Sequence, residues 1–176
     1  MSLWERSALL LALGATGCVA YARAQGGTAF GTSDQQGHSG PIVTADAAIH
    51  SPWPKTSEGT SPLIVQTSLE ALIASQRKDL GWGTGLGLMS PLSPVGGQVI
   101  VGTNAHVGFA DGKTSLGGIS PYVDLGVRAP LASDSEKYTR QWFLSLDFTG
   151  QTYFDFLHKR APEQIICVKF GVGWGD

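Results

Sequence analysis

The sequence predicts an all-β fold, an antiparallel meander whose strands close into a small barrel of six to eight strands, preceded by an extended N-terminal arm. Three observations support this prediction. Apolar residues recur at every second position over several long stretches, as they do on strands with one apolar face. Turn-forming residues separate these stretches. The composition, with 24 glycines, 9 prolines and only 15% charged residues, favours strands and turns over helix bundles.

The beginning of the chain is typical of an export signal, and we expect a signal peptide over residues 1–24. Arg6 precedes an apolar run, Ser7–Ala20, and the ending Ala22-Arg23-Ala24 fits peptidase cleavage before Gln25. The alternative, an uncleaved membrane anchor, is disfavoured because a spanning helix needs about 20 apolar residues and this run is shorter.

A second mode of processing stays open. Gly17-Cys18 resembles a lipoprotein signal, in which Cys18 would be lipidated and become the first residue, although Ala15 stands where such signals usually carry leucine. The other cysteine of the chain is Cys167. Cleavage after Ala24 would leave it alone, so we expect no internal disulfide to hold the domain together.

Residues 25–61 are predicted to form a flexible arm ahead of a barrel domain over residues 62–176. The arm is rich in Gly, Ser, Thr and Pro and poor in large apolar residues. Val43–Ile49 gives a weak strand signal within it, which Pro52 ends.

The next segment, Leu63–Ser75, fits two structures. As a strand it places Val65, Leu69 and Ile73 on one face. As a helix it has a capping pair, Thr67 and Glu70. The neighbouring strand patterns favour the strand.

Five further runs alternate with period two and are separated by polar turns. The fourth of them is long enough to be one long strand or a hairpin whose loop preserves the alternation. Its even positions are apolar, among them Trp142, Leu144, Leu146 and Phe148. The first contains a Gly-x-Gly pattern, but its strict alternation argues against a phosphate-binding loop, which opens a helix. The runs are Gly81–Met89, Gln98–Phe109, Ile119–Leu131, Tyr138–Leu157 and Ile166–Trp174.

Sorting the residues of these runs by parity separates an apolar face from a sparse polar face in which glycine is frequent. A soluble sandwich also alternates, but glycine replaces the Lys, Glu and Thr expected on a solvated face, and each apolar face is long enough to cross a bilayer. We therefore expect a polar network in the barrel lumen and an aromatic, lipid-facing girdle outside. The predicted lumen residues are Glu70, Asn104, His106, Asp124, Arg128, Asp147 and Lys169, and the predicted girdle residues are Trp82, Phe109, Trp142, Phe156 and Trp174.

These patterns resemble the small bacterial outer-membrane β-barrel proteins. The segments that carry the resemblance are Gly81–Met89, Ile119–Val127 and Val168–Trp174. The resemblance implies export followed by folding into the outer membrane. Two features depart from that class. The chain ends on Trp174-Gly175-Asp176 rather than on an aromatic residue, and six strands are clear where the smallest single-chain barrels have eight.

Two hints of enzymatic chemistry are present. Thr103–Val107 resembles the segment around the catalytic histidine of trypsin-like proteases, but no serine after Asp124 lies in the glycine-rich setting of a nucleophile. The adjacent pairs His38-Ser39 and His50-Ser51 resemble the His and Ser of lipid A deacylase barrels, yet both lie in the predicted arm. We predict no catalytic residues, no metal site and no cofactor.

The leading hypothesis is an exported, non-enzymatic outer-membrane β-barrel that acts as a structural or accessory part of a cell-envelope assembly. Its expected partners are membrane lipid and other envelope proteins, and oligomer formation is compatible with the same outer face. The net charge of −2, without a basic patch, excludes nucleic acid. Two alternatives stay open: a secreted or periplasmic soluble β-sandwich or barrel that binds a ligand or a partner protein, and a lipid A-modifying envelope enzyme.

Overall fold

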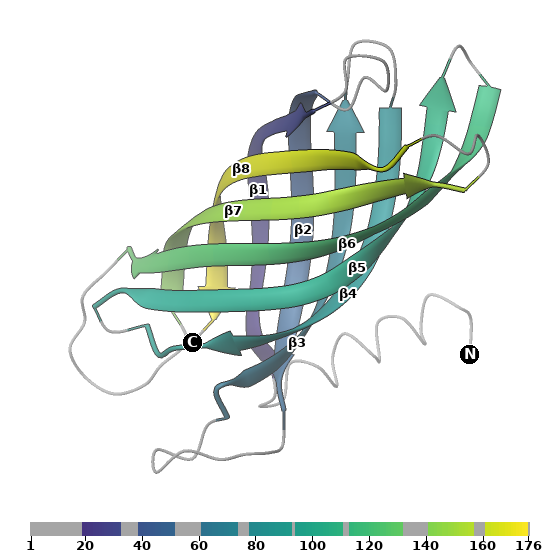
Figure 1. Cartoon of the computed structure of the whole chain (residues 1–176). Coiled ribbons are helices and arrows are strands. Elements are labelled where there is room, and N and C mark those ends of the chain that lie inside the picture. Colours follow the sequence, from purple (N-terminus) through teal and green to yellow (C-terminus); the bar gives the residue numbers. More distant parts are fainter. Residues whose placement is uncertain are drawn as a thin grey trace, which may run out of the picture.

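A single closed barrel is formed by the chain in a computed structural model that describes residues 19–32, 39–51, 61–73, 78–92, 94–110, 113–131, 141–156 and 161–175. Eight antiparallel strands follow one another around the barrel in sequence order (Figure 1). This confirms the predicted all-β meander. No helix among these residues is long and apolar enough to cross a membrane. The strands are β1 (Val19–Gly31), β2 (Gly40–His50), β3 (Leu63–Ile73), β4 (Lys78–Met89), β5 (Gly96–Ala110), β6 (Lys113–Pro130), β7 (Gln141–Asp155) and β8 (Glu163–Gly175).

The barrel closes where β1 pairs with β8. The register runs from Tyr21 opposite Gly175 to Gly31 opposite Ile165, so the pairing covers almost the whole of β1. On its other side β1 pairs with β2, from Val19 opposite Ile49 to Ala29 opposite Gly40. Closure leaves no unpaired sheet edge, which would otherwise expose backbone N–H and C=O groups.

The two faces of every strand differ because successive side chains point to opposite sides of the sheet. In β4 the pattern is strict: Gly81, Gly83, Gly85 and Gly87 point inward and are buried, and the residues between them are exposed on the outer surface. The longest strand is β6, and the β5–β6 hairpin projects beyond its neighbours in Figure 1.

The strands predicted from the sequence are present, and two uncertainties are resolved. Leu63–Ile73 is a strand rather than a helix. The long run is not a hairpin, because Gln141–Asp155 forms one strand, β7. The turns predicted around Asp111-Gly112 and over Ala132–Lys137 lie outside the described residues.

The missing two strands come from the N-terminal part, where the prediction of an extended arm over residues 25–61 is wrong for the described residues. Gln25–Gly31 belongs to β1, and Gly40–His50 forms β2. The outward side chains of β1 are small except for Phe30, and they include Ala22 and Ala24, so the sequence carries little apolar periodicity there. Strand pairing uses backbone hydrogen bonds and does not depend on side-chain size. Residues 19–24, expected to be the end of the signal peptide, form the first part of β1.

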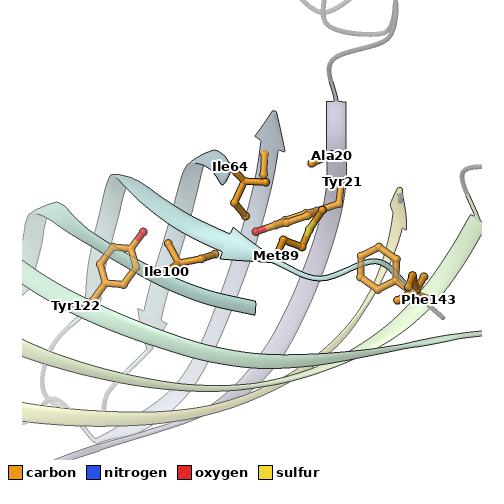
Figure 2. Packing of buried hydrophobic residues seen from close by; sticks show 9 residues of the cluster. Ala20, Tyr21, Ile64, Met89, Ile100, Tyr122 and Phe143 are labelled. Carbon is orange, nitrogen blue, oxygen red and sulfur yellow. The ribbon is translucent and has the colours of Figure 1, made fainter. Parts of the chain in front are cut away.

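The lumen is filled with side chains along its length. One apolar cluster lies at the end of the barrel where β1 begins and β8 ends, and Figure 2 shows its side chains, among them Tyr21, Ile64, Met89 and Phe143. A second cluster lies at the opposite end and includes Ile42, Leu72, Tyr153 and Ile165. Along β2, β3 and β7 the inward residues between the two clusters are mostly polar. We call the cluster that contains Tyr21 the first apolar plug and the cluster that contains Tyr153 the second. The described interior is therefore a polar layer between these two apolar plugs.

Candidate functional site: the polar interior of the barrel

All seven residues that the sequence places in the lumen are buried inside the barrel. They come from β3, β5, β6, β7 and β8, and the inward phase of each strand positions them. Five of them belong to three sets of contacts: an ionic cluster near the middle of the lumen, an arginine held against the first apolar plug, and a histidine–serine pair. Of the other two, Glu70 accepts a hydrogen bond from Gln151 Nε2 at 3.5 Å, and Asn104 Oδ1 accepts one from Ser68 Oγ at 3.4 Å. The seven are Glu70, Asn104, His106, Asp124, Arg128, Asp147 and Lys169.

The centre of the ionic cluster is Arg23, whose side chain is fully buried. Its Nε donates to Asp46 Oδ2 and its Nη1 lies against Asp147 Oδ2, both at 2.5 Å. Its Nη2 lies 3.6 Å from Asp124 Oδ2. One guanidinium therefore faces three carboxylates that belong to β2, β6 and β7. A buried carboxylate is stable only when it is paired, and Arg23 is the partner that these three carboxylates share.

Asp124 completes the cluster with contacts of its own. Lys169 Nζ lies 3.4 Å from its Oδ1. Thr149 Oγ1 donates to the same oxygen at 2.5 Å, and Gln98 Nε2 donates to Oδ2 at 3.2 Å. Gln25, from β1, donates through Nε2 to Asp147 Oδ2 at 2.7 Å. Neutral donors therefore share the carboxylate oxygens with the two cations, as buried ionised groups require.

Arg128 contacts the backbone and two aromatic rings beside the first apolar plug. Its Nη2 donates to the carbonyl oxygen of Ser90 at 2.7 Å. Its guanidinium carbon lies 5.9 Å from the ring centroid of Tyr21 and 5.5 Å from that of Phe143, within the range of cation–π contacts. These contacts follow from its level along the barrel, because Arg128 lies near the end of β6.

His106 forms a pair with Ser120 that sequence reasoning did not find. His106 Nε2 lies 2.5 Å from Ser120 Oγ, and Ser120 Oγ donates to Gln151 Oε1 at 3.1 Å. A hydroxyl has one proton, so when Ser120 donates to Gln151 the imidazole is the donor to Ser120 and does not act as its base. Ser120 is fully buried. The pair therefore has the character of a packing contact rather than of an activated nucleophile.

Of the two adjacent His-Ser pairs, the structure describes both residues only for His50-Ser51. His50 Nδ1 bonds the backbone carbonyl of Ser61 at 2.7 Å, and His38 lies outside the described residues. Asp124 lies opposite Ile100 on β5, six residues along that strand from His106, so the protease-like pairing of His106 with Asp124 is not formed. Among the described residues, no group of three or more His, Cys, Asp or Glu side chains is placed to hold a metal ion.

Glycines on the inward face of β4 make room for the larger side chains of β5 and β6. A Cβ atom at Gly83 would overlap Asn104 Oδ1, and one at Gly85 would lie 2.7 Å from the hydroxyl oxygen of Tyr122. A Cβ at Gly81 would lie 3.0 Å from His106 Nδ1. The bare face of β4 is therefore a packing requirement of the filled lumen.

The predicted girdle residues lie on the outer surface. Trp142 and Trp174 are directly opposite each other on β7 and β8, at the end of the barrel where β8 finishes. Trp82 lies inside β4 rather than at its end, and its indole N–H donates to Thr67 Oγ1 at 3.2 Å. These three tryptophans border a shallow groove of about 630 Å³ over the small outward residues of β1 and β2. Phe109 and Phe156 are also exposed and lie toward the opposite end.

The fold and the filled lumen define the class of protein: the chain has the architecture of the small outer-membrane β-barrels that its sequence resembles. The solved structure of Neisserial surface protein A (NspA) is similar over 89% of this chain and 96% of that chain, with a TM-score of 0.67 and 13% sequence identity. At this identity the likeness concerns the fold. No protein-family model and no curated protein matches the sequence.

Several central residues were not predicted. Arg23 was assigned to the signal peptide and Asp46 to the arm, so the pair that joins β1 to β2 was missed. A signal was present, because Tyr21, Arg23 and Gln25 alternate with Ala22 and Ala24. Ser120 and Gln151 are also inward residues, but a sequence does not show which inward residues meet across the lumen.

Arg23→Met should lower the free energy of unfolding by about 3–5 kcal/mol, because Asp46 and Asp147 would be left as buried charges without their main partner. Urea-induced unfolding in detergent micelles measures this loss. Combining it with Asp46→Asn should cost less than the sum of the two single changes, by about 0.5–3 kcal/mol, since the two residues share one interaction. Strict additivity would contradict the direct pairing.

Ser120→Ala should lower the free energy of unfolding by about 1–3 kcal/mol, because His106 and Gln151 lose a buried partner. The lipid composition of cells that express the variant should equal that of cells with the unchanged protein. Thr152→Ala is the matched control, since Thr152 bonds Gln164 on the exposed face, and a change of roughly 0.5 kcal/mol or less is expected there. Altered lipids together with unchanged stability would instead favour an enzyme.

Proposed function

We propose that this protein is an exported, non-enzymatic β-barrel of the outer membrane that acts as a structural or accessory component of a cell-envelope assembly. Membrane lipid is its first partner in this proposal, and other envelope proteins or further copies would bind at its rims or outer face. The fold shared with NspA supports the barrel class. The proposal of a non-enzymatic role is supported by a buried histidine–serine pair that substrate cannot reach.

The observation that carries the proposal is the apolar outer surface of a single closed sheet. Every strand carries large apolar side chains that point away from the lumen, and many are half exposed or more, among them Leu69 at 60%, Val101 at 59% and Leu125 at 51%. In the described part of the chain no second sheet or helix covers them. Such a surface is unfavourable in water and is the expected surface of a barrel in hydrocarbon.

Membrane fractionation tests the proposal. The protein should be recovered with outer membranes, resist extraction by alkaline carbonate, and migrate faster on gels before boiling than after it. The faster migration reflects a barrel that stays folded in detergent until it is heated. Recovery as a soluble periplasmic monomer that needs no detergent would contradict the proposal and support the alternative of a soluble binding protein.

A pair of arginine substitutions separates membrane from water as the surrounding medium. Val123 points outward near the middle of β6, opposite Val101 on β5, whereas Leu131 follows the end of β6 at the rim. Val123→Arg should cost about 2–4 kcal/mol of folding free energy in lipid vesicles, and Leu131→Arg about 0–1 kcal/mol. Urea titration of vesicle-embedded protein measures both. Equal, small effects at the two positions are expected of a protein surrounded by water.

A further inference from the structure

Cleavage after Ala24, which the sequence predicts, would remove residues 19–24, and the structure places these residues in strand β1. Residues 19–24 are not an appendage of the barrel. Val19 and Tyr21–Ala24 pair with β2, and Tyr21–Ala24 also pair with β8 on the other side. Removing them would leave the facing backbone groups of Ala45–Ile49 and Val172–Gly175 without these partners. In hydrocarbon each such unsatisfied group is costly.

The side chains of this segment are as deeply integrated as its backbone. Ala20 and Tyr21 are fully buried in the first apolar plug, where Figure 2 shows the Tyr21 ring beside Met89. The Tyr21 ring also meets Phe143 edge to face at 6.3 Å between centroids. Arg23 compensates Asp46 and Asp147. A chain that begins at Gln25 would lose these contacts while keeping the carboxylates.

The sequence offers another processing site just upstream. Ala15 and Gly17 have the small side chains that a signal peptidase accepts three residues and one residue before the cut. A cut after Gly17 leaves Arg6 and the apolar run up to Gly17 on the leader side. The first residue of the mature chain would be Cys18, immediately before Val19, where β1 begins.

We propose that the leader is removed between Gly17 and Cys18, so that the mature chain keeps residues 19–24 as the first part of β1. The inference rests on the export that the proposed function requires. The two fail separately: absence from the outer membrane would count against the proposed function, whereas an outer-membrane barrel that begins at Gln25 would overturn this inference alone.

The N-terminus of the purified mature protein tests the proposal. Trypsin cleaves after Arg23, so mass spectrometry should find a peptide that covers Cys18–Arg23, either plain or carrying lipid on Cys18. Both forms support cleavage before Cys18, and their masses distinguish the ordinary from the lipoprotein route. A first residue at Gln25, at any position inside β1, or at Met1 overturns it.

Two leucine substitutions give a matched comparison, because a large side chain immediately before the cut blocks signal peptidase. Gly17→Leu should make the unprocessed precursor accumulate. Ala24→Leu should be processed like the unchanged protein, and it should still fold because Ala24 is exposed on the outer face of β1. The opposite pattern, in which only Ala24→Leu blocks processing, overturns the proposal.

A disulfide test detects the segment in the folded barrel. Ala24 lies directly opposite Val172 across the β1–β8 seam, and both are exposed outside. With Cys18 and Cys167 replaced by serine, Ala24→Cys with Val172→Cys should form an oxidised crosslink, because opposed strand residues lie within disulfide reach. Thr28→Cys with Val168→Cys, on the same seam beyond either cleavage site, is the control. A crosslink in the control and none at 24–172 overturns the proposal.

Discussion

Closure of the sheet by β1 against β8 is the constraint on which the rest of the structure depends. The strand ladder runs without interruption from β1 through β8 and back to β1, so the described barrel has no open edge. Because the ring is closed, the two faces of the sheet become an inside and an outside, and the alternation of each strand sorts side chains between them. The arrangement of charge in the lumen and of apolar side chains on the surface both follow from this one topological fact.

The interior then has to solve a problem of charge. Closure brings the carboxylates of Asp46, Asp124 and Asp147 into one confined space, and the negative charge is tolerable only because Arg23 and Lys169 enter the same space from β1 and β8. The cluster therefore contains residues from both sides of the β1–β8 seam, Arg23 and Lys169, together with residues of β2, β6 and β7. Arg23 of β1 contacts Asp124 of β6 and Asp147 of β7, which lie far along the chain. These charges therefore meet only when the strands are arranged in this order. Such a network favours this register over one slipped by a residue, which would turn every charge outward.

The sequence was sufficient to predict the strands that carry large apolar residues, because Val, Leu, Phe and Trp at alternate positions leave a clear period of two. It was insufficient for β1, where Ala22, Ala24 and Gly26 face outward and the pattern is faint. The signal-peptide pattern over the same residues also competed with the strand pattern. Which inward residues are buried followed from parity alone, but their pairing did not. Arg128 and Lys169 are both inward cations, and only the tilt and register of β6 and β8 place one against aromatic rings and the other against Asp124.

The glycine-lined inner face of β4 has a consequence for how this lumen could change. Asn104, Tyr122 and His106 already occupy the space in front of Gly83, Gly85 and Gly81, so β5 and β6 rather than β4 supply the bulk in this part of the interior. Trimming β5 or β6 would create voids that β4 could refill only by exchanging several glycines at once. The side chains of β5 and β6 and the glycines of β4 therefore depend on one another for packing. A hollow, conducting version of this barrel would require several simultaneous substitutions rather than one.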